Sequence, residues 1–307
     1  MTARDGMGLS SHGPSVFGGM VDASRGRKFM PGDVPRFMKP IPMFPRPSRF
    51  ARLAVPLALA ALLQIPAEAA PPPTKPTILL VHGAFTESLS WESVISKLLA
   101  DGYPVVAAAN PLRGLTSDST YVATLVDTIP GPVVMAGHSY GGAVISNAAA
   151  GKHNVKGLVF VSAFAPEAGE TLGELGEKFP GSTLGAALEP PVSLPGGGAD
   201  LYVRPDQYRD QIAADLPPTT AALLAATQRP VAAAAFTDKA GLPAWKTVPS
   251  RFIYGSADKA IAPPLMAYMA QRAGSRHTVV IQGASHAVLA SHPDQVAKLI
   301  EEAANAD

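Results

Sequence analysis

From Thr77 onward, apolar segments of strand length alternate with segments of helical periodicity, and this alternation restricts the possible folds more than any other feature. Helical spacing covers 91–100, 121–129 and 143–150, and Asp118 or Ser119 is available as an N-cap for the second of these helices. The expected strands lie at 77–81, 105–109, 132–136, 157–161, 251–254 and 277–281. Strands that are apolar on both faces and separated by helices are typical of parallel sheets. We therefore predict an α/β fold whose mostly parallel central sheet carries helices on both faces.

The alternation stops between about 165 and 250. This stretch contains Gly- and Pro-rich pieces such as 194–198, and helical pieces around 207–215 and 219–227. We interpret it as a helical cap inserted into one domain that spans 77–307.

The segment 43–69 has the three parts of a secretory signal. Residues 46–52 are basic, 53–65 form a short apolar run, and Ala67-Glu68-Ala69 places small residues where a signal peptidase reads them. The run is shorter than the about 20 apolar residues that a membrane span needs. We predict cleavage after Ala69 and export to the periplasm or the medium, without stable membrane insertion afterwards. An uncleaved anchor and a buried helix are the alternatives.

Residues 1–42 are rich in Gly, Pro, Ser and Met and show no periodic apolar pattern, so we expect a disordered leader. A start at Met43 would give a signal peptide of ordinary length, and a misassigned start codon is one hypothesis for this leader. The Pro-rich segment 70–76 is expected to form a stiff tether before the domain.

Composition excludes several classes of function. The 238 residues from 70 onward carry 16 basic and 20 acidic side chains, a formal charge of −4, so they have no excess of positive charge for binding nucleic acid. The chain has no Cys, which excludes disulfides, thiolate nucleophiles and Cys-based metal sites. Its hydrophobic content of 47% supports a buried core.

Gly137-His138-Ser139-Tyr140-Gly141 matches G-x-S-x-G and joins an expected strand to an expected helix. This context suits a sharp turn that presents a serine hydroxyl above the sheet. The glycines suit a turn against which a neighbouring part of the chain packs closely. The N-terminus of the following helix favours negative charge that develops at the reacting centre. We therefore predict that Ser139 is a nucleophile. The alternative is an ordinary Gly-Ser turn.

A serine hydroxyl needs a base that takes its proton. Among seven histidines, His286 lies in a loop after the last expected strand, where such a base is expected. His292 is a weaker candidate because it precedes Pro293, at an expected helix start. His138 is adjacent to Ser139 in sequence, but the turn should direct its side chain away. The other histidines are not expected to act as the base. They lie in the leader (His12), in a polar loop (His153), at a strand start (His277) and in the loop after the first strand, which His82 is expected to support.

The base in turn needs an acid that fixes its tautomer. Asp258 follows the expected strand 251–254, and the order Ser, Asp, His is the one used with the G-x-S-x-G turn. Glu167, in the turn after strand 157–161, is the main competitor. A turn residue with a local hydrogen bond is the other interpretation of Asp258.

Acyl transfer also requires donors for an oxyanion. The backbone N–H of Tyr140, directly after Ser139, is one expected donor. The second should come from the loop after the first strand, with Ala84 the first choice and Phe85 the second.

Five pieces of the chain together carry a resemblance to a known family: VHGAF near residue 83, Asn110-Pro-Leu-Arg-Gly114, GHSYGG, Asp258 and SHAVLASHP around His286. On these motifs, the chain from 77 to 307 resembles the esterase and hydroxynitrile-lyase branch of the α/β-hydrolases. The resemblance, to an exported bacterial member, implies a cofactor-free enzyme without a metal, whose cap shapes an apolar pocket over the serine. It offers Gln228-Arg229-Pro230, Tyr202, Tyr208, Phe236 and Trp245 as lining candidates, although aromatic residues of this kind are more often packing residues.

The lyase members of this branch carry Thr where Gly83 stands and Lys where Ala287 stands, and both groups help to handle cyanide. Their absence favours a carboxylic ester, cleaved through an acyl-enzyme on Ser139, as the small-molecule substrate. Perhydrolase, haloperoxidase-like or cyanohydrin-lyase chemistry on the same three residues, and a ligand-binding protein without turnover, are the alternatives. The sequence indicates neither the ester nor the oligomeric state.

Overall fold

The computed structural model describes residues 75–306. The predicted leader, the signal peptide and all but the last two residues of the tether lie outside this range. Among the described residues, no helix combines the length and the apolar character that a membrane span requires.

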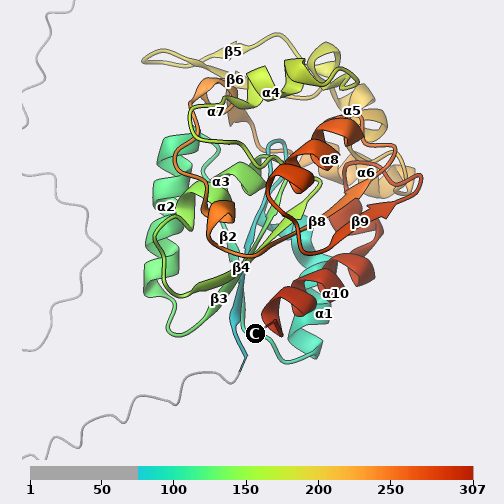
Figure 1. The fold of residues 1–307 in the computed structure, drawn as a ribbon. Helices are drawn as coiled ribbons and strands as arrows, with labels where there is room; N and C mark the ends of the chain where they lie inside the picture. The colour runs from blue at the N-terminus through green and yellow to red at the C-terminus, as the bar shows by residue number, and fades with distance from the viewer. Residues whose placement is uncertain (1–74, 307) are drawn as a thin grey trace, which may run out of the picture. The chain divides into compact units, whose positions relative to one another are not determined.

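Six strands form one sheet in the order β2-β1-β3-β4-β8-β9 (Figure 1), and each neighbouring pair within it is parallel. The predicted parallel sheet is therefore confirmed. The order places β1 between β2 and β3, so the loops that follow β1 and β3 leave the sheet side by side at its carboxyl edge, where sites form in such folds. The strands are β1 Thr77–Val81, β2 Val105–Ala108, β3 Val133–His138, β4 Val155–Val161, β8 Ser250–Gly255 and β9 Thr278–Ile281.

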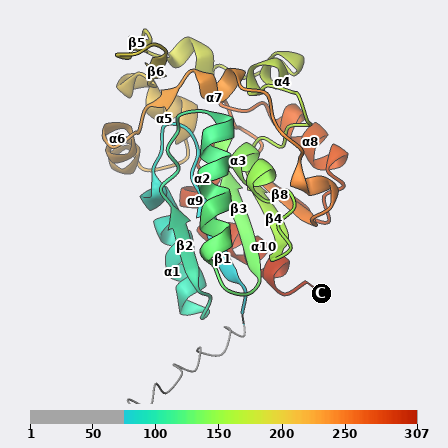
Figure 2. The ribbon, with the colours of Figure 1, turned by 90° about the vertical axis from the view of Figure 1, so that its left-hand side faces the viewer.

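Alternate residues of the inner strands enter two separate cores, one on each face of the sheet. Leu79 and Val81 pack in the core that includes α2, α3 and α8, whereas Ile78 and Leu80 pack with α1 and α10. Figure 2 shows α2 and α3 in front of the sheet. Full burial of each such aliphatic side chain stabilises the fold by about 1.5–3 kcal/mol. The helices of the core domain are η1 Ser88–Trp91, α1 Glu92–Ala100, α2 Leu115–Thr128, α3 Tyr140–Ala148, α8 Pro263–Arg272, α9 Val288–Ser291 and α10 Pro293–Ala304.

Helix α2 begins earlier than the sequence predicts. Its first residue is Leu115 and its N-cap is Gly114, so the prediction of Asp118 or Ser119 as the cap is wrong. The carboxylate of Asp118 instead reaches back from inside the first turn and accepts the amide of Arg113 at 3.1 Å from each oxygen. The polar residues of this first turn carry no apolar periodicity, so the early start was not visible in the sequence.

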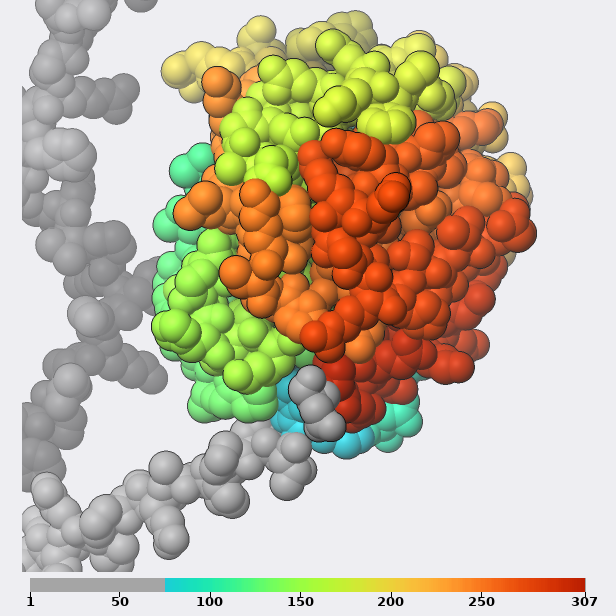
Figure 3. Space-filling view, viewed as in Figure 1, coloured from blue at the N-terminus to red at the C-terminus, as the bar shows by residue number. Residues whose placement is uncertain are grey.

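The segment between β4 and β8 lies over the carboxyl edge of the sheet, and Figure 3 shows its yellow-green and yellow parts across the top of the molecule. Besides helices it contains a three-stranded antiparallel sheet, β5-β6-β7, which the sequence did not indicate because strands of two or three residues show no periodicity. Its elements are α4 Leu172–Lys178, η2 Leu184–Ala187, β5 Val192–Ser193, β6 Ala199–Leu201, α5 Pro205–Ile212, α6 Pro218–Ala226, β7 Val231–Ala232, α7 Ala234–Thr237 and η3 Ala244–Lys246.

We call this segment the cap. Arg113, in the loop between β2 and α2, joins the cap to the core domain: its guanidinium lies 2.7 Å from Asp200 and donates to the carbonyl of Pro230 at 3.0 Å. The amide of Ala232 also donates to the carbonyl of Leu112. These polar contacts fix the small sheet of the cap above the loop.

Candidate active site

Ser139 occupies a strained turn between β3 and α3. Its φ of 54° and ψ of −121° lie outside the regions that side-chain-bearing residues ordinarily adopt. Hydrogen bonds hold the turn: the Ser139 amide donates to Val161, and the Ser139 carbonyl accepts from Gly142 and Phe164, each at 3.1 Å. The strained backbone therefore presents one side chain at the carboxyl edge of the sheet.

Close packing explains the glycines around this turn. A Cβ at Gly137 would lie 2.4 Å from the carbonyl oxygen of Gly141, and a Cβ at Gly141 would lie 2.4 Å from the carbonyl oxygen of Val81. Real Cβ atoms are not found so close to backbone, so only Gly allows α3 to start this near to β1 and β3. The pattern G-x-S-x-G is thus the local requirement for the turn.

His286 and Asp258 form a buried pair. Nδ1 of His286 lies 2.7 Å from Oδ2 of Asp258, and the two side chains are 3% and 0% exposed. The other carboxylate oxygen, Oδ1, accepts the amides of Ala260 and Ile261 at 2.8 and 2.9 Å. The acid is therefore held by backbone on one side and fixes the imidazole on the other. Since Nδ1 faces Asp258, Nε2 is the ring nitrogen left for Ser139.

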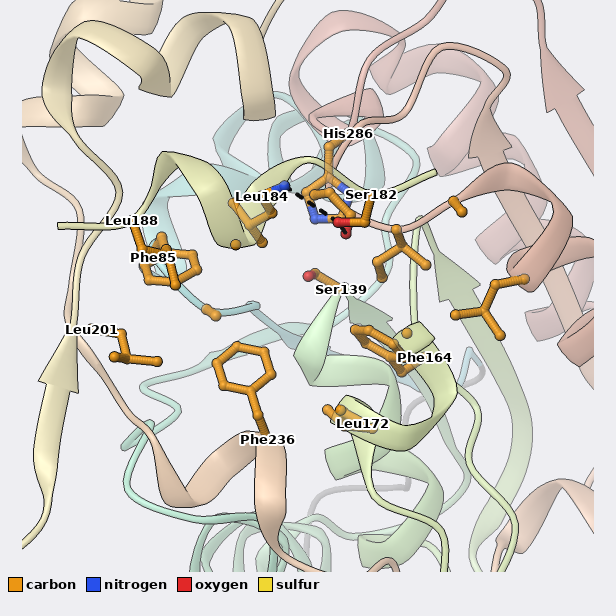
Figure 4. Close-up of a pocket in the computed structure, with 18 of the residues that line it drawn as sticks. Phe85, Ser139, Phe164, Leu172, Ser182, Leu184, Leu188, Leu201, Phe236 and His286 are labelled. Atoms are coloured by element: carbon orange, nitrogen blue, oxygen red, sulfur yellow. Dashed lines mark hydrogen bonds between the residues drawn. The ribbon is translucent and has the colours of Figure 1, made fainter. Parts of the chain in front are cut away.

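Ser139 and His286 line the same cavity, and Figure 4 shows their side chains on its wall. The sequence separates these residues by more than 140 positions, and the fold brings them together. No hydrogen bond joins them in the described conformation, and such bonds often tighten only when the substrate is bound. The fold thus brings the predicted nucleophile, base and acid together at one site.

The two stretches of backbone that were predicted to supply oxyanion donors lie beside Ser139. Tyr140 is the first residue of α3, so its amide has no partner within the helix. Ala84 and Phe85 both line the cavity from the loop after β1. A Cβ on Gly83 would lie 2.6 Å from the Cβ of Ser139, which shows how closely this loop approaches the nucleophile. All the residues expected to supply oxyanion donors therefore lie around the same serine.

The side chain of Tyr140 is anchored below the site. Its hydroxyl donates to Oδ2 of Asp118 at 2.7 Å, and both residues are fully buried. Burial, followed by the negative charge of Asp118, raises the pKa of Tyr140 well above its ordinary value, so the hydroxyl remains a donor. This contact could not be predicted from the sequence, where Asp118 was expected at a helix cap.

His138 and His82 are buried near the site and stay neutral. Nε2 of His138 donates to the carbonyl of His286 at 3.1 Å, and the two rings are 4.7 Å apart. Burial, with the nearby His286, holds the pKa of His138 well below its usual range. Burial also lowers the pKa of His82 to about 4, although its hydrogen bond with the carbonyl of Gly83 acts the other way. His138 therefore braces the backbone of the His286 loop.

The remaining sequence candidates are engaged elsewhere. Glu167 pairs with Lys246 at 2.7 Å, while the Nδ1 of His286 is occupied by Asp258. Hydrogen bonds from Lys246 and Ala168 outweigh the effect of slight burial and lower the pKa of Glu167. His292 is the N-cap of α10 and lies 2.8 Å from the Ser291 hydroxyl.

The cavity has a volume of about 410 Å³, and apart from His286 no residue that lines it is titratable. Its walls come from both the cap and the core domain, as Figure 4 shows. The bulkiest apolar residues among them are Phe85, Phe164, Leu172, Phe179, Leu184, Leu188, Leu201, Ile212, Phe236, Ile261 and Leu265. Besides Ser139 and His286, its polar side chains are the hydroxyls of Ser182 and Thr237. The cavity therefore suits an uncharged, apolar group.

Of the suggested lining residues, only Phe236 reaches this cavity. Tyr208 instead donates its hydroxyl to the carbonyl of Phe85, and Trp245 donates its indole N–H to the carbonyl of Pro166. Gln228 bonds the backbone of Val203. These side chains support the walls rather than form them. Within residues 75–306, no three His, Asp or Glu side chains gather as a metal site would require.

Comparison with known proteins agrees with this architecture. The model of the alpha/beta hydrolase family matches residues 78–299. A curated alpha/beta hydrolase, nvfD of Aspergillus novofumigatus, is 25% identical over 252 residues, which cover 75% of this chain and 97% of that protein.

Two solved structures share the fold at low identity. Polyneuridine aldehyde esterase superposes with a TM-score of 0.65 at 20% identity and covers 74% of this chain and 98% of its own. A pyrethroid hydrolase from Sphingobium faniae JZ-2 superposes with a TM-score of 0.60 at 22% identity and covers 75% of this chain and 98% of its own.

Proposed function

We propose that this chain, which belongs to the alpha/beta hydrolase family, cleaves a neutral carboxylic ester through an acyl-enzyme on Ser139. The observation that carries the proposal is the buried His286–Asp258 pair, joined at 2.7 Å, at the cavity that also holds Ser139 on its strained turn. A turn of this kind and an oriented imidazole are what a serine nucleophile requires.

In the first half of the reaction, Oγ of Ser139 attacks the ester carbonyl carbon and its proton passes to Nε2 of His286. Asp258 stabilises the imidazolium that results. The carbonyl oxygen becomes an oxyanion, which accepts hydrogen bonds from the amides of Tyr140 and Ala84 and is stabilised by the positive end of α3. Collapse of this intermediate breaks the bond to the alcohol, which leaves with the proton from His286.

In the second half, a water molecule takes the place of the alcohol. His286 accepts one of its protons as the oxygen attacks the acyl carbon, and a second oxyanion forms at the same donors. When this intermediate collapses, Ser139 recovers its proton from His286 and the free acid is released. The cycle returns every group to its starting state.

The walls of the cavity support an uncharged substrate. Burial of an ion without a partner costs far more than binding returns, and no Lys or Arg lines the cavity to receive a carboxylate. The many aliphatic and aromatic side chains favour an apolar acyl or alcohol group of moderate size. The solved relatives include proteins described as esterases and as a pyrethroid hydrolase, which agrees with this proposal.

Crowding at Gly83 argues against cyanohydrin lysis. The lyase members of the family carry Thr at this position, but a Cβ here would lie 2.6 Å from the Cβ of Ser139 and 2.9 Å from the carbonyl oxygen of His138. Neither neighbour is the far end of a flexible side chain. A threonine at this position would therefore require the loop or the turn to move.

The proposal is tested with p-nitrophenyl esters of increasing acyl length and a fluorophosphonate probe. We expect the protein to hydrolyse esters with short to medium acyl chains and the probe to label Ser139. Hydrolysis and labelling should both be nearly lost in Ser139→Ala. Ser193→Ala serves as the control, because Ser193 is exposed in β5 and does not line the cavity. Equal hydrolysis by Ser139→Ala and the unaltered protein would rule out the serine mechanism.

We further propose that the protein is exported after cleavage behind Ala69, because basic, apolar and small residues follow one another there. N-terminal sequencing of the protein recovered from the medium or the periplasm tests this, and an intact residue 69 joined to residue 70 would contradict it.

A further inference from the structure

The cap contacts the chain on both sides of His286. The carbonyl oxygen of Ile212, the last residue of α5, accepts the amide of Ala287 at 2.9 Å and lies 3.1 Å from the hydroxyl of Ser285. Ser285 and Ala287 are the immediate neighbours of His286 in sequence. The backbone that carries the imidazole is therefore held by one residue of the cap, and Ile212 also lines the cavity.

A carboxylate of the cap completes this contact. The hydroxyl of Ser285 donates to Oδ1 of Asp215, three residues beyond the end of α5. Ser285 is 2% exposed, and the side chain of Asp215 is 19% exposed. The other oxygen, Oδ2, lies 3.7 Å from Nδ1 of His292. Asp215 thus stands between the residue before His286 and the start of α10.

The charge state of Asp215 suits this role. Burial by itself would raise the pKa of Asp215, but hydrogen bonds from Ser285 and Ser291 outweigh it and lower the pKa below its ordinary value. The carboxylate is therefore ionised at neutral pH, and hydrogen bonds to an ionised acceptor are roughly twice as strong as neutral ones.

We propose that Asp215 and Ser285 are positioning residues, through which the cap sets the orientation of the His286 imidazole; the inference rests on the proposed function of His286 as the base. His286 already has two fixed contacts: its ring Nδ1 with Asp258, and its backbone carbonyl with His138. Both of these come from the core domain. The Asp215–Ser285 contact adds a third constraint from the cap, on the same short loop.

Orientation of the base affects the proton transfer more than it affects substrate binding. A misplaced imidazole still leaves the apolar walls in position, so the loss should fall on kcat rather than on KM. Loss of the constraint should also loosen the Nδ1–H···Asp258 hydrogen bond, whose proton is buried and should exchange slowly with water.

The experiment measures kcat and KM with a p-nitrophenyl ester for Asp215→Ala, Ser285→Ala and the double variant. We expect kcat to fall by about tenfold in each single variant, with KM changed by less than about twofold. The double variant should lose no more than the worse single one, because both changes remove the same contact. Asp215→Asn keeps an oxygen acceptor for Ser285 and should recover most of kcat.

Asp210→Ala is the matched control, since Asp210 lies on the exposed side of α5 in the same part of the cap. It should leave kcat and KM unchanged. If Asp215→Ala fails to fold, Asp215→Asn and Ser285→Ala still test the contact. A change confined to KM, or unchanged kcat in folded Ser285→Ala and Asp215→Ala, would overturn the inference.

A second readout does not depend on turnover. The downfield proton signal of the His286 Nδ1–H should be sharp in the unaltered protein and in Asp210→Ala, and broadened in Asp215→Ala and Ser285→Ala. If the unaltered protein hydrolyses no ester but its signal still depends on Asp215, the proposed hydrolase function is refuted and the positioning role of Asp215 is supported. A signal that is the same in all four proteins would refute the positioning role.

Discussion

The hydroxyl of Tyr140 donates a 2.7 Å hydrogen bond to Asp118, and neither residue has exposed surface. The bond joins the residue after Ser139 to the first turn of α2. Asp118 also accepts the backbone amide of Arg113, whose guanidinium binds the cap. The turn that carries the nucleophile and the loop that holds the cap therefore share one buried carboxylate.

Tyr140→Phe should remove the strongest side-chain donor from this carboxylate. We expect the free energy of unfolding to fall by about 1–3 kcal/mol, the usual cost when a hydrogen bond to a buried charge is lost. Urea unfolding at pH 7 measures this loss. Tyr121→Phe is the control, because Tyr121 also belongs to this region but is 39% exposed. A loss of less than about 0.5 kcal/mol in Tyr140→Phe would mean that Asp118 is satisfied without it.

Gly83→Ala should damage catalysis more than stability. The added Cβ would meet the Cβ of Ser139 at 2.6 Å, so the loop with the oxyanion donors and the serine must separate. A misplacement of about 1 Å at a reacting centre costs about 100-fold, and we expect kcat/KM on a p-nitrophenyl ester to fall by at least that factor.

Gly241→Ala is the control for that loss, since its new Cβ would meet nothing closer than 3.7 Å and Gly241 does not line the cavity. Its kcat/KM should stay within about twofold of the original. If Gly83→Ala retained a similar rate, the loop after β1 would not supply an oxyanion donor at its present position.

The sequence was sufficient to predict the sheet and the order of the three proposed catalytic residues. Apolar runs define buried parallel strands directly, and the expected 77–81 and 277–281 segments agree with β1 and β9 within one residue. Ser139 and Asp258 were recognisable because each lies within a few residues of the end of a strand, at the edge where functional side chains gather in this kind of fold.

The cap was less predictable because its structure depends on contacts with the core domain. Leu188 and Leu201 line the cavity from segments without periodicity, and Asp215 contacts Ser285 across 70 residues of sequence. The environments of Asp118 and His138 likewise arise only when separate elements pack together. Local patterns in a single sequence carry no information of this kind.

Acid should destabilise the fold through His82. Its pKa is lowered to about 4 by burial, whereas the unfolded chain should titrate near 6.5. Between these values the unfolded state binds more protons, so the free energy of unfolding falls as the pH drops from 6.5 toward 4. At pH 5 the loss from this one residue is about 2 kcal/mol relative to pH 7.5.

Urea unfolding of the unaltered protein, His82→Gln and His153→Gln at pH 7.5 and 5 checks this origin. His82→Gln should show a smaller difference between the two pH values, even if it is less stable at both. His153 is exposed, so His153→Gln should keep the full difference. Identical pH dependence in all three proteins would place the acid sensitivity elsewhere, with the buried His138 the next candidate.

The apolar cavity should discriminate strongly by charge. We expect kcat/KM for a p-nitrophenyl ester of a neutral six-carbon acid to exceed that for the matching half-ester with a free terminal carboxylate by at least about 100-fold, since the cavity offers an ion no partner. Initial rates at neutral pH measure both constants. Equal constants would mean that the acyl chain does not enter the cavity.

Leu188→Lys tests the same argument from the side of the protein. Leu188 is a partly buried residue of the cap that lines the cavity, so an ammonium group here would give the terminal carboxylate a counterion. The preference for the neutral ester should fall by about tenfold, chiefly through a lower KM for the charged one. Leu223→Lys, on the exposed surface of α6, should leave the preference unchanged. An equal shift in both variants would indicate a general attraction to added positive charge rather than contact within the cavity.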